Sequence, residues 1–208
     1  MGYPDTRGAQ DEALIERAKA GDGQAFDELY AKYKRPILNF IYRMIGNKET
    51  AEELTQETFV RVYMNLSTFS PKGKVSSWIY TIAGNLAKNE LRDKKYFHDI
   101  PLETIVVNDE TSVKLSDLIA IHKKNPEEIA EDKELQESIQ KIFDTIPEKY
   151  RQVLVLCDVQ ELSYEEVASI IGCSVGTVAS RLSRARAIFM KRFGADLGGA
   201  HHKTGNDL

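Results

Sequence analysis

Arginine and hydroxyl side chains recur at short intervals in the stretch CSVGTVASRLSRAR, residues 173–186. The stretch contains three arginines, Arg181, Arg184 and Arg186, and no acidic residue. Wound into a helix, it would place these guanidinium and hydroxyl groups toward solvent and its apolar residues on the opposite side. Guanidinium and hydroxyl groups bond phosphates and purine edges. The chemistry that this pattern favours is therefore nucleic-acid recognition.

The distribution of charge supports this interpretation, although the total does not. A net charge of -4 over 208 residues would by itself argue against a nucleic-acid binder. Yet residues 103–137 hold ten acidic residues against four basic ones, whereas residues 167–195 hold five basic residues and no acid. Such segregation indicates one chain with surfaces for different partners.

The residues around the basic stretch predict a helix-turn-helix. Ser163 and Glu166 have the spacing of a capping box at the start of a helix. Gly172 suits the left-handed residue that ends it, and Ser174 suits the N-cap of the next helix. In this arrangement the second helix enters the major groove of DNA. The alternative is a solvated helix whose arginines only complement the negative end of its dipole.

Amphipathic helices are also expected over residues 11–96. The apolar stripe of the second helix predicts a bend or break at Pro36. The helix that follows Asn47 carries Phe59 and Tyr63 on its apolar face, and a helix over residues 77–95 has Trp78 on its own apolar stripe. This position favours a role in the core for Trp78.

The fold class that follows is all-α, with two small helical domains joined by an extended linker. We expect four segments: an N-terminal helical bundle at 12–96, the linker at 97–125, the helix-turn-helix domain at 126–193 and a disordered tail at 194–208.

Several classes of function find no support in the composition. No apolar run approaches the roughly 20 residues of a membrane helix, and the first residues lack a signal-peptide pattern, so we expect a cytoplasmic protein that does not insert into membranes. Cys157 and Cys173 lack metal-ligand spacing and are expected to be reduced thiols. We expect no cofactor and no metal, and no role for the His201–His202 pair. No phosphate loop or nucleophile motif is present, so no enzyme activity is expected.

Two separate motifs resemble one family. LSYEEVASIIGCSVGTVASRLSRAR, residues 162–186, is similar to the promoter-reading domain of bacterial extracytoplasmic-function (ECF) sigma factors. AEELTQETFVRVY, residues 51–63, is similar to a helix in the first domain of that family, and the next helix matches as well. The resemblance covers residues 12–96 and 126–193. It implies a sigma factor that directs core RNA polymerase to promoters during a stress response and performs no catalysis itself.

The resemblance also implies roles for particular residues. The surface that docks on the clamp of the largest polymerase subunit would include Glu53, Gln56 and Glu57. Recognition and melting of the minus-ten element would fall to Lys74, Asn85, Lys88, Asn89 and Arg92. Ser180, Arg181 and Arg184 would read the minus-thirty-five element, with Thr177 and Arg186 nearer the phosphates. Residues 139–156 would pack on the flap of the second-largest subunit.

Two features limit or extend this picture. Ala179 stands where relatives often carry a basic residue. Because a methyl group contacts thymine but cannot bond guanine, we expect the promoter motif to differ from theirs. The family is commonly held inactive by an anti-sigma factor, which the resemblance implies here too. Without the resemblance, the charges on residues 53–57 would be read as a solvated helix face. The rival function is a dimeric helix-turn-helix regulator that binds a palindromic operator.

Overall fold

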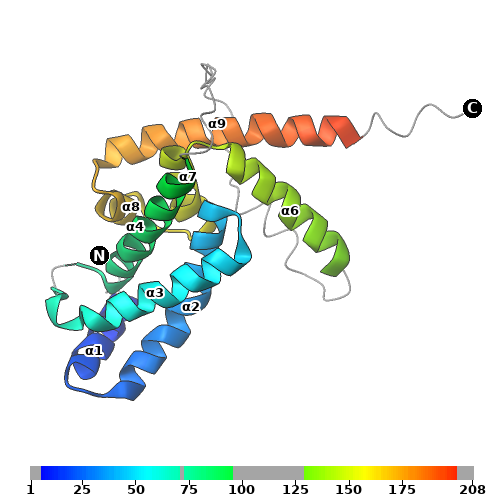
Figure 1. The fold of residues 1–208 in the computed structure, drawn as a ribbon. Coiled ribbons are helices and arrows are strands. Elements are labelled where there is room, and N and C mark those ends of the chain that lie inside the picture. The colour runs from blue at the N-terminus through cyan, green and yellow to red at the C-terminus, as the bar shows by residue number, and fades with distance from the viewer. Residues whose placement is uncertain (1–5, 71–72, 96–128, 201–208) are drawn as a thin grey trace, which may run out of the picture.

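The computed structural model describes residues 6–70, 73–95 and 129–200, and all the regular elements in this part of the chain are helical (Figure 1). In chain order they are α1 (Thr6–Lys19), α2 (Gly23–Ile45), α3 (Lys48–Met64), η1 (Leu66–Thr68), α4 (Val75–Lys95), α6 (Ile129–Thr145), α7 (Glu148–Leu154), η3 (Val155–Val159), α8 (Tyr164–Ile171) and α9 (Val175–Ala200). The all-α prediction is confirmed. The predicted linker, 97–125, lies outside the described residues, as do residues 126–128 and 201–208.

Helix α2 is the centre of the N-terminal half. Asp22 caps it by accepting hydrogen bonds from two backbone amides of the first turn, and Gly46 ends it in the left-handed region at a φ of 79°. Of the bend or break expected at Pro36, the break is wrong, because α2 runs continuously through the proline. Buried residues one turn apart, Tyr33 and Ile37, pack on either side of the proline and hold the helix there. Helices α1, α3 and α4 all pack on α2.

The C-terminal half is built around α9. This helix packs on α6, α7 and α8, and it continues through Ala200. Residues 194–200 are therefore helical, which corrects the tail predicted from residue 194. The segment contains no proline, and none of its glycines has a positive φ, so nothing in its backbone ends the helix there.

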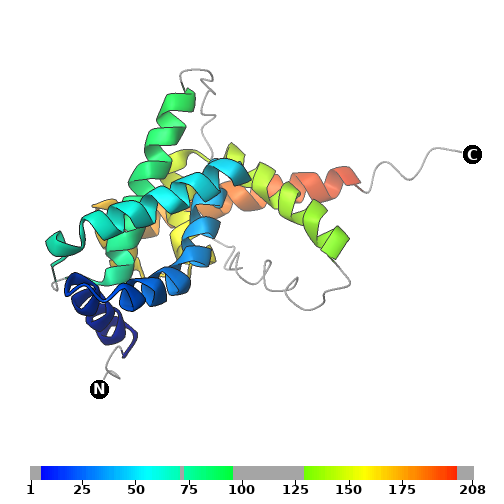
Figure 2. The same ribbon diagram turned by 60° about the horizontal axis from the view of Figure 1, so that its bottom comes forward.

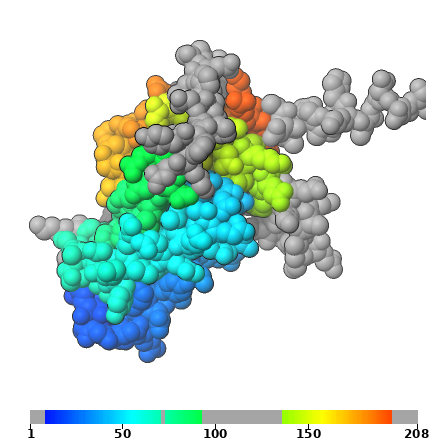
Figure 3. All heavy atoms as spheres, viewed as in Figure 1, coloured from blue at the N-terminus to red at the C-terminus, as the bar shows by residue number. Residues whose placement is uncertain are grey.

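The two halves pack against each other (Figures 1 and 3). Helix α2 contacts α6 and η3, and α4 contacts α8. The buried apolar side chains of the two halves form one continuous core in the described part of the chain.

Polar groups also cross the junction between the halves. The Arg43 guanidinium donates to the side-chain oxygen of Gln140 at 3.0 Å and also bonds Gln136. The Arg151 guanidinium donates to the Met44 carbonyl at the end of α2 and, within its own half, to the carbonyls of Asp144 and Ile146 at 3.0 and 3.1 Å. Buried arginines thus tie α2 to α6 and α7.

None of the described helices is long and apolar enough to cross a membrane. Cys157 and Cys173 are both free thiols.

Replacing Arg151 by methionine should strongly destabilise the protein. The change keeps an apolar stem but leaves the carbonyls that Arg151 serves without a donor, so we expect the free energy of unfolding to fall by about 2–4 kcal/mol. Urea unfolding followed by circular dichroism measures this. Arg61→Met is the control, because the Arg61 guanidinium makes an exposed i,i+4 pair with Glu57, and its loss should cost less than about 0.5 kcal/mol. Equal losses in the two variants would contradict the assignment.

Candidate nucleic-acid interface

The helix-turn-helix has the local geometry that the sequence predicts. The Ser163 hydroxyl accepts from the Glu166 amide at 3.3 Å, and the Glu166 carboxylate accepts from the Ser163 amide at 3.0 Å. Gly172 ends α8 at a φ of 67° in the left-handed region. The Ser174 hydroxyl then caps α9 by accepting from the Thr177 amide at 3.2 Å. The capping box, the turn and the second cap are all confirmed.

The first turns of α9 present a polar face to solvent. Ser180 and Arg184 are exposed, while Thr177 and Arg181 are half-buried. Within the described residues, no carboxylate lies within salt-bridge distance of Arg181 or Arg184. Arg184 reaches the hydroxyl of Tyr150 at 3.5 Å, and this contact lowers the pKa of Tyr150. Two cations on this face are thus available to an anionic partner.

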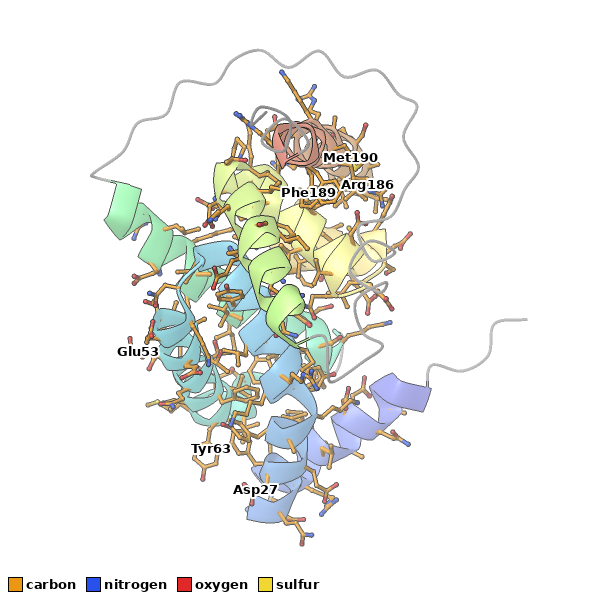
Figure 4. The ribbon with its side chains drawn as sticks, turned by 90° about the vertical axis from the view of Figure 1, so that its right-hand side faces the viewer. Asp27, Glu53, Tyr63, Arg186, Phe189 and Met190 are labelled. Carbon is orange, nitrogen blue, oxygen red and sulfur yellow. The ribbon has the colours of Figure 1, made fainter. Side chains whose placement is uncertain are left out.

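Arg186 is engaged differently from the other two arginines. Its Nε and Nη2 donate to both carboxylate oxygens of Asp158 at 2.8 and 2.6 Å, and Asp158 is buried in the π-helical turn η3. These hydrogen bonds, which the Asp158 carboxylate accepts, raise the pKa of the Arg186 guanidinium above its ordinary value. Figure 4 labels Arg186 close to Phe189 and Met190. This geometry fits an internal tie between α9 and η3 better than the phosphate contact expected from the sequence.

A second polar face lies on α4. Its predicted residues recur at helical spacing, with Asn85, Asn89 and Arg92 exposed and Lys88 half-buried. Helix α4 projects from the body of the molecule in Figure 2. Trp78, in the first turn of α4, is half-buried, and its ring lies 5.1 Å from that of Phe69. Helix α4 is therefore packed at its first turn, and further along it exposes a face of amide and basic side chains.

Lys74 stands apart from that face and contacts the other half. Its ammonium group lies 3.2 Å from the Glu166 carboxylate of α8. Although partial burial of Glu166 opposes ionisation, hydrogen bonds from Ser163 and Lys74 lower the pKa of Glu166. Nearby, the Tyr80 hydroxyl donates to the Gln160 side chain at 2.8 Å. The structure therefore places the start of α4 against the helix-turn-helix.

The outer face of α3 carries the predicted polymerase-binding residues. Glu53 and Gln56 are exposed, and Figure 4 shows Glu53 at the periphery of the N-terminal half. Glu57 accepts from Arg61 at 2.7 Å and is half-exposed. All three lie on one accessible face of the helix.

That face continues into apolar residues that the sequence analysis missed. Val60 and Met64 are 51% and 73% exposed, and they follow Gln56 at intervals of four residues. Tyr63 is 60% exposed, which corrects its expected place on the apolar face, although its ring edge packs on Phe26 at 5.1 Å. The i, i+4, i+8 spacing of Gln56, Val60 and Met64 was the available signal. Exposed apolar groups beside acids suit a protein partner.

No group of three or more metal-binding side chains occurs among the described residues.

Family models match two separate segments of the chain. The family model Sigma-70 region 2 matches residues 29–96, and the model Sigma-70, region 4, matches residues 136–188. The chain is 37% identical to the ECF RNA polymerase sigma factor SigW of Bacillus subtilis, over 86% of this chain and 94% of that protein. It is 34% identical to the RNA polymerase sigma-H factor of Pseudomonas aeruginosa, over 85% of this chain and 90% of that protein.

Two solved structures are similar in fold. One is CnrH in complex with the cytosolic domain of CnrY, with a TM-score of 0.65, 21% identity and coverage of 90% of this chain and 99% of that one. The other is the sigma factor RpoE of Bartonella quintana in complex with the anti-sigma factor NepR, with a TM-score of 0.59, 20% identity and coverage of 82% and 98%.

The tie between Arg186 and Asp158 predicts energetic coupling. In a double-mutant cycle with Arg186→Met and Asp158→Asn, we expect about 1–3 kcal/mol of coupling in the free energy of unfolding, because Asp158 is buried and both of its oxygens are bonded. Urea unfolding of the parent, the two single variants and the double variant gives this value. Coupling below about 0.5 kcal/mol would show that the pair does not stabilise the fold, and it would favour the phosphate contact that the sequence predicts for Arg186.

Proposed function

The chain belongs to the extracytoplasmic-function group of the sigma-70 family of RNA polymerase sigma factors, and we propose that it divides promoter recognition between its two halves. Its partners are core RNA polymerase and promoter DNA, and it confers specificity on transcription initiation. We assign residues 12–96 to polymerase binding and the minus-ten element, and residues 126–193 to the minus-thirty-five element. The observation that carries this assignment is the capped helix-turn-helix. On its exposed face, Arg181 and Arg184 pair with no carboxylate among the residues that the structure describes.

The minus-thirty-five element is read by the start of α9. Ser180, Arg181 and Arg184 contact base edges in the major groove, and Thr177 contacts the phosphates. Arg186 holds α9 in position through its hydrogen bonds to Asp158 of η3. Ala179 is exposed beside them and offers a methyl group to thymine, so the sequence read at this position differs from one read by a basic residue.

The minus-ten element is opened and held by α4. Asn85 and Asn89 supply amide groups for unstacked bases, while Lys88 and Arg92 follow the backbone of the single strand. Lys74 lies at the entrance of α4 and contributes to the same surface once it is released from Glu166.

Core polymerase is bound by α3. Glu53, Gln56 and Glu57 dock on the clamp of the largest subunit, and the exposed Val60 and Met64 extend this surface with apolar contact. The helices of residues 139–156 pack on the flap of the second-largest subunit.

The two halves separate when both promoter elements are bound. Minus-ten and minus-thirty-five positions are about 25 base pairs apart, or roughly 80 Å along the duplex. In the present structure Lys74 at the start of α4 touches Glu166 of the helix-turn-helix. The contacts between α4 and α8 must therefore break before both halves engage one promoter.

An anti-sigma factor is the regulator that this family assignment favours. The similar structures of CnrH and RpoE were solved with CnrY and with the anti-sigma factor NepR, respectively. For this chain, a partner that covers the α3 face would block polymerase binding and so keep the protein inactive.

Run-off transcription tests the proposed function directly. The purified protein is added to sigma-free core polymerase on fragmented genomic DNA, and transcript starts are mapped. New starts that share two spaced motifs are expected. An absence of starts, with the protein alone protecting a palindromic site from nuclease, would instead favour a dimeric regulator.

Arg184→Ala should weaken promoter discrimination. The loss of an outward guanidinium on the recognition helix should cost about 1–3 kcal/mol of preference for the best minus-thirty-five sequence over its variants. Competitive initiation on promoters differing only at that element measures this. Lys191→Ala, which removes an exposed charge further along α9, should leave the preference intact. An unchanged preference in Arg184→Ala would exclude the contact.

The combined change Gln56→Ala and Glu57→Ala should weaken binding to core polymerase about tenfold without unfolding the protein, because both side chains lie on the exposed face of α3. Titration of labelled protein with core enzyme gives the affinity, and thermal unfolding gives the stability. Asp27→Ala is the control, since Asp27 is exposed near the N-terminus of α2 (Figure 4). Parental affinity in the double variant would refute the docking surface.

A further inference from the structure

Helix α1 lies before the segment that matches the family's region 2 model, which begins at residue 29. It is nevertheless firmly attached to the body of the N-terminal half. Asp11 is buried and accepts from the Tyr33 hydroxyl of α2 at 2.6 Å, and it also pairs with Lys32. Ile15 is fully buried in the core. The position of α1 is therefore fixed relative to α2.

The end of α1 is fixed as well. The Arg17 guanidinium lies 2.7 Å from the carboxylate of Asp22, which is also the N-cap of α2. This anchorage holds the last turn of α1 beside η1, the short helix that follows α3. The last residue of α1, Lys19, is then directed at the chain just beyond η1.

Lys19 makes three contacts there. Its Nζ donates to the Phe69 carbonyl at 3.2 Å, lies 5.7 Å from the centroid of the Phe69 ring, and pairs with Glu16 at 2.8 Å. Only 22% of the Lys19 side chain is exposed. A lysine this well covered, with its charge shared between a carbonyl, a ring and a carboxylate, holds a defined position.

Phe69 stands at the entrance to the connection between η1 and α4. Its own ring is buried and packs at 5.1 Å on Trp78, in the first turn of α4. This ring contact joins the backbone at Phe69 to the start of α4, the helix that carries Asn85 and Asn89. Lys19 contacts Phe69 twice, through a hydrogen bond to its carbonyl and through its ring.

We propose that Lys19 is a positioning residue for promoter strand opening. By holding the Phe69 carbonyl and ring, it fixes the entrance of the η1–α4 connection and the base of α4, so that the groups that receive the unpaired strand are ordered in advance. This inference rests on the proposed function, because it concerns the same minus-ten surface. Ordering before binding removes an entropic cost from the step that uses the surface.

The expected defect is confined to strand opening. Lys19→Met removes both the hydrogen bond to Phe69 and the cation over its ring. Lys19→Arg retains a cation and a donor at the same place. Lys34→Met is the matched control: Lys34 lies 5.4 Å from the Tyr30 ring on α2, so this variant also loses one positive charge and one cation–ring contact, but away from Phe69.

The experiment uses holoenzyme assembled from core polymerase and each full-length variant, on the strongest promoter found by run-off mapping. The rate at which minus-ten thymines become reactive to permanganate reports opening, and core affinity and thermal unfolding are measured in parallel. We expect Lys19→Met to open the promoter about three- to tenfold more slowly, with core affinity within about twofold of the parent. Lys19→Arg and Lys34→Met should open within about twofold of the parental rate.

Opening by Lys19→Met at the parental rate would overturn the proposal. So would a slow rate that Lys19→Arg does not restore, or one accompanied by an equal loss of core affinity and of thermal stability, because either result indicates a general structural role. If the parent protein itself opens no promoter, the proposed function fails and not this inference.

Discussion

The Arg151 guanidinium is the interaction on which the arrangement of the two halves depends. It is buried, so each of its N–H groups needs an acceptor, and it finds them on backbone carbonyls at or just beyond the ends of two helices. Carbonyls at a helix C-terminus lack partners within the helix and carry partial negative charge. Desolvation lowers the pKa of Arg151, but arginine remains charged in such a place. One cation therefore fixes the ends of α2 and α6 relative to α7.

Two glycines of the N-terminal half leave room for side chains of the C-terminal half at this junction. A Cβ at Gly84 would lie 2.9 Å from the side-chain nitrogen of Gln152, and one at Gly46 would lie 2.9 Å from the Asp144 carboxylate. Hydrogen bonds accompany the apolar contacts across the junction, such as those of Arg43 with Gln140 and of Tyr80 with Gln160. Water can replace such bonds at a modest net cost in free energy. The proposed separation of the halves would exchange these hydrogen bonds for water, and it would also expose apolar side chains of the shared core, which costs more.

The charged and polar surfaces lie on different helices, which suits the different partners that we propose for them. The recognition face is on α9, the amide and basic face on α4, and the acidic and apolar face on α3. The overall negative charge is no obstacle to DNA binding, since the field near a surface depends on its nearest charges and falls off within about 10 Å at 0.1 M salt. Segregation along the chain becomes segregation over the surface because each face belongs to a single helix.

Local signals in the sequence determined the elements of this protein. The capping box at Ser163 and Glu166, the glycine at 172 and the apolar periodicity of α8 and α9 each act within a few residues, so they could be recognised without the fold. Only the tertiary structure decided how far these elements extend and what their side chains contact. The path of α2 through Pro36 depends on packing on both sides of the proline. The exposure of Tyr63 depends on how the start of α2 lies beside it, and the bonding of Arg186 depends on Asp158, which lies 28 residues away in the sequence. Such contacts between distant residues carry no periodic signal, because their partners are brought together only when the core is packed.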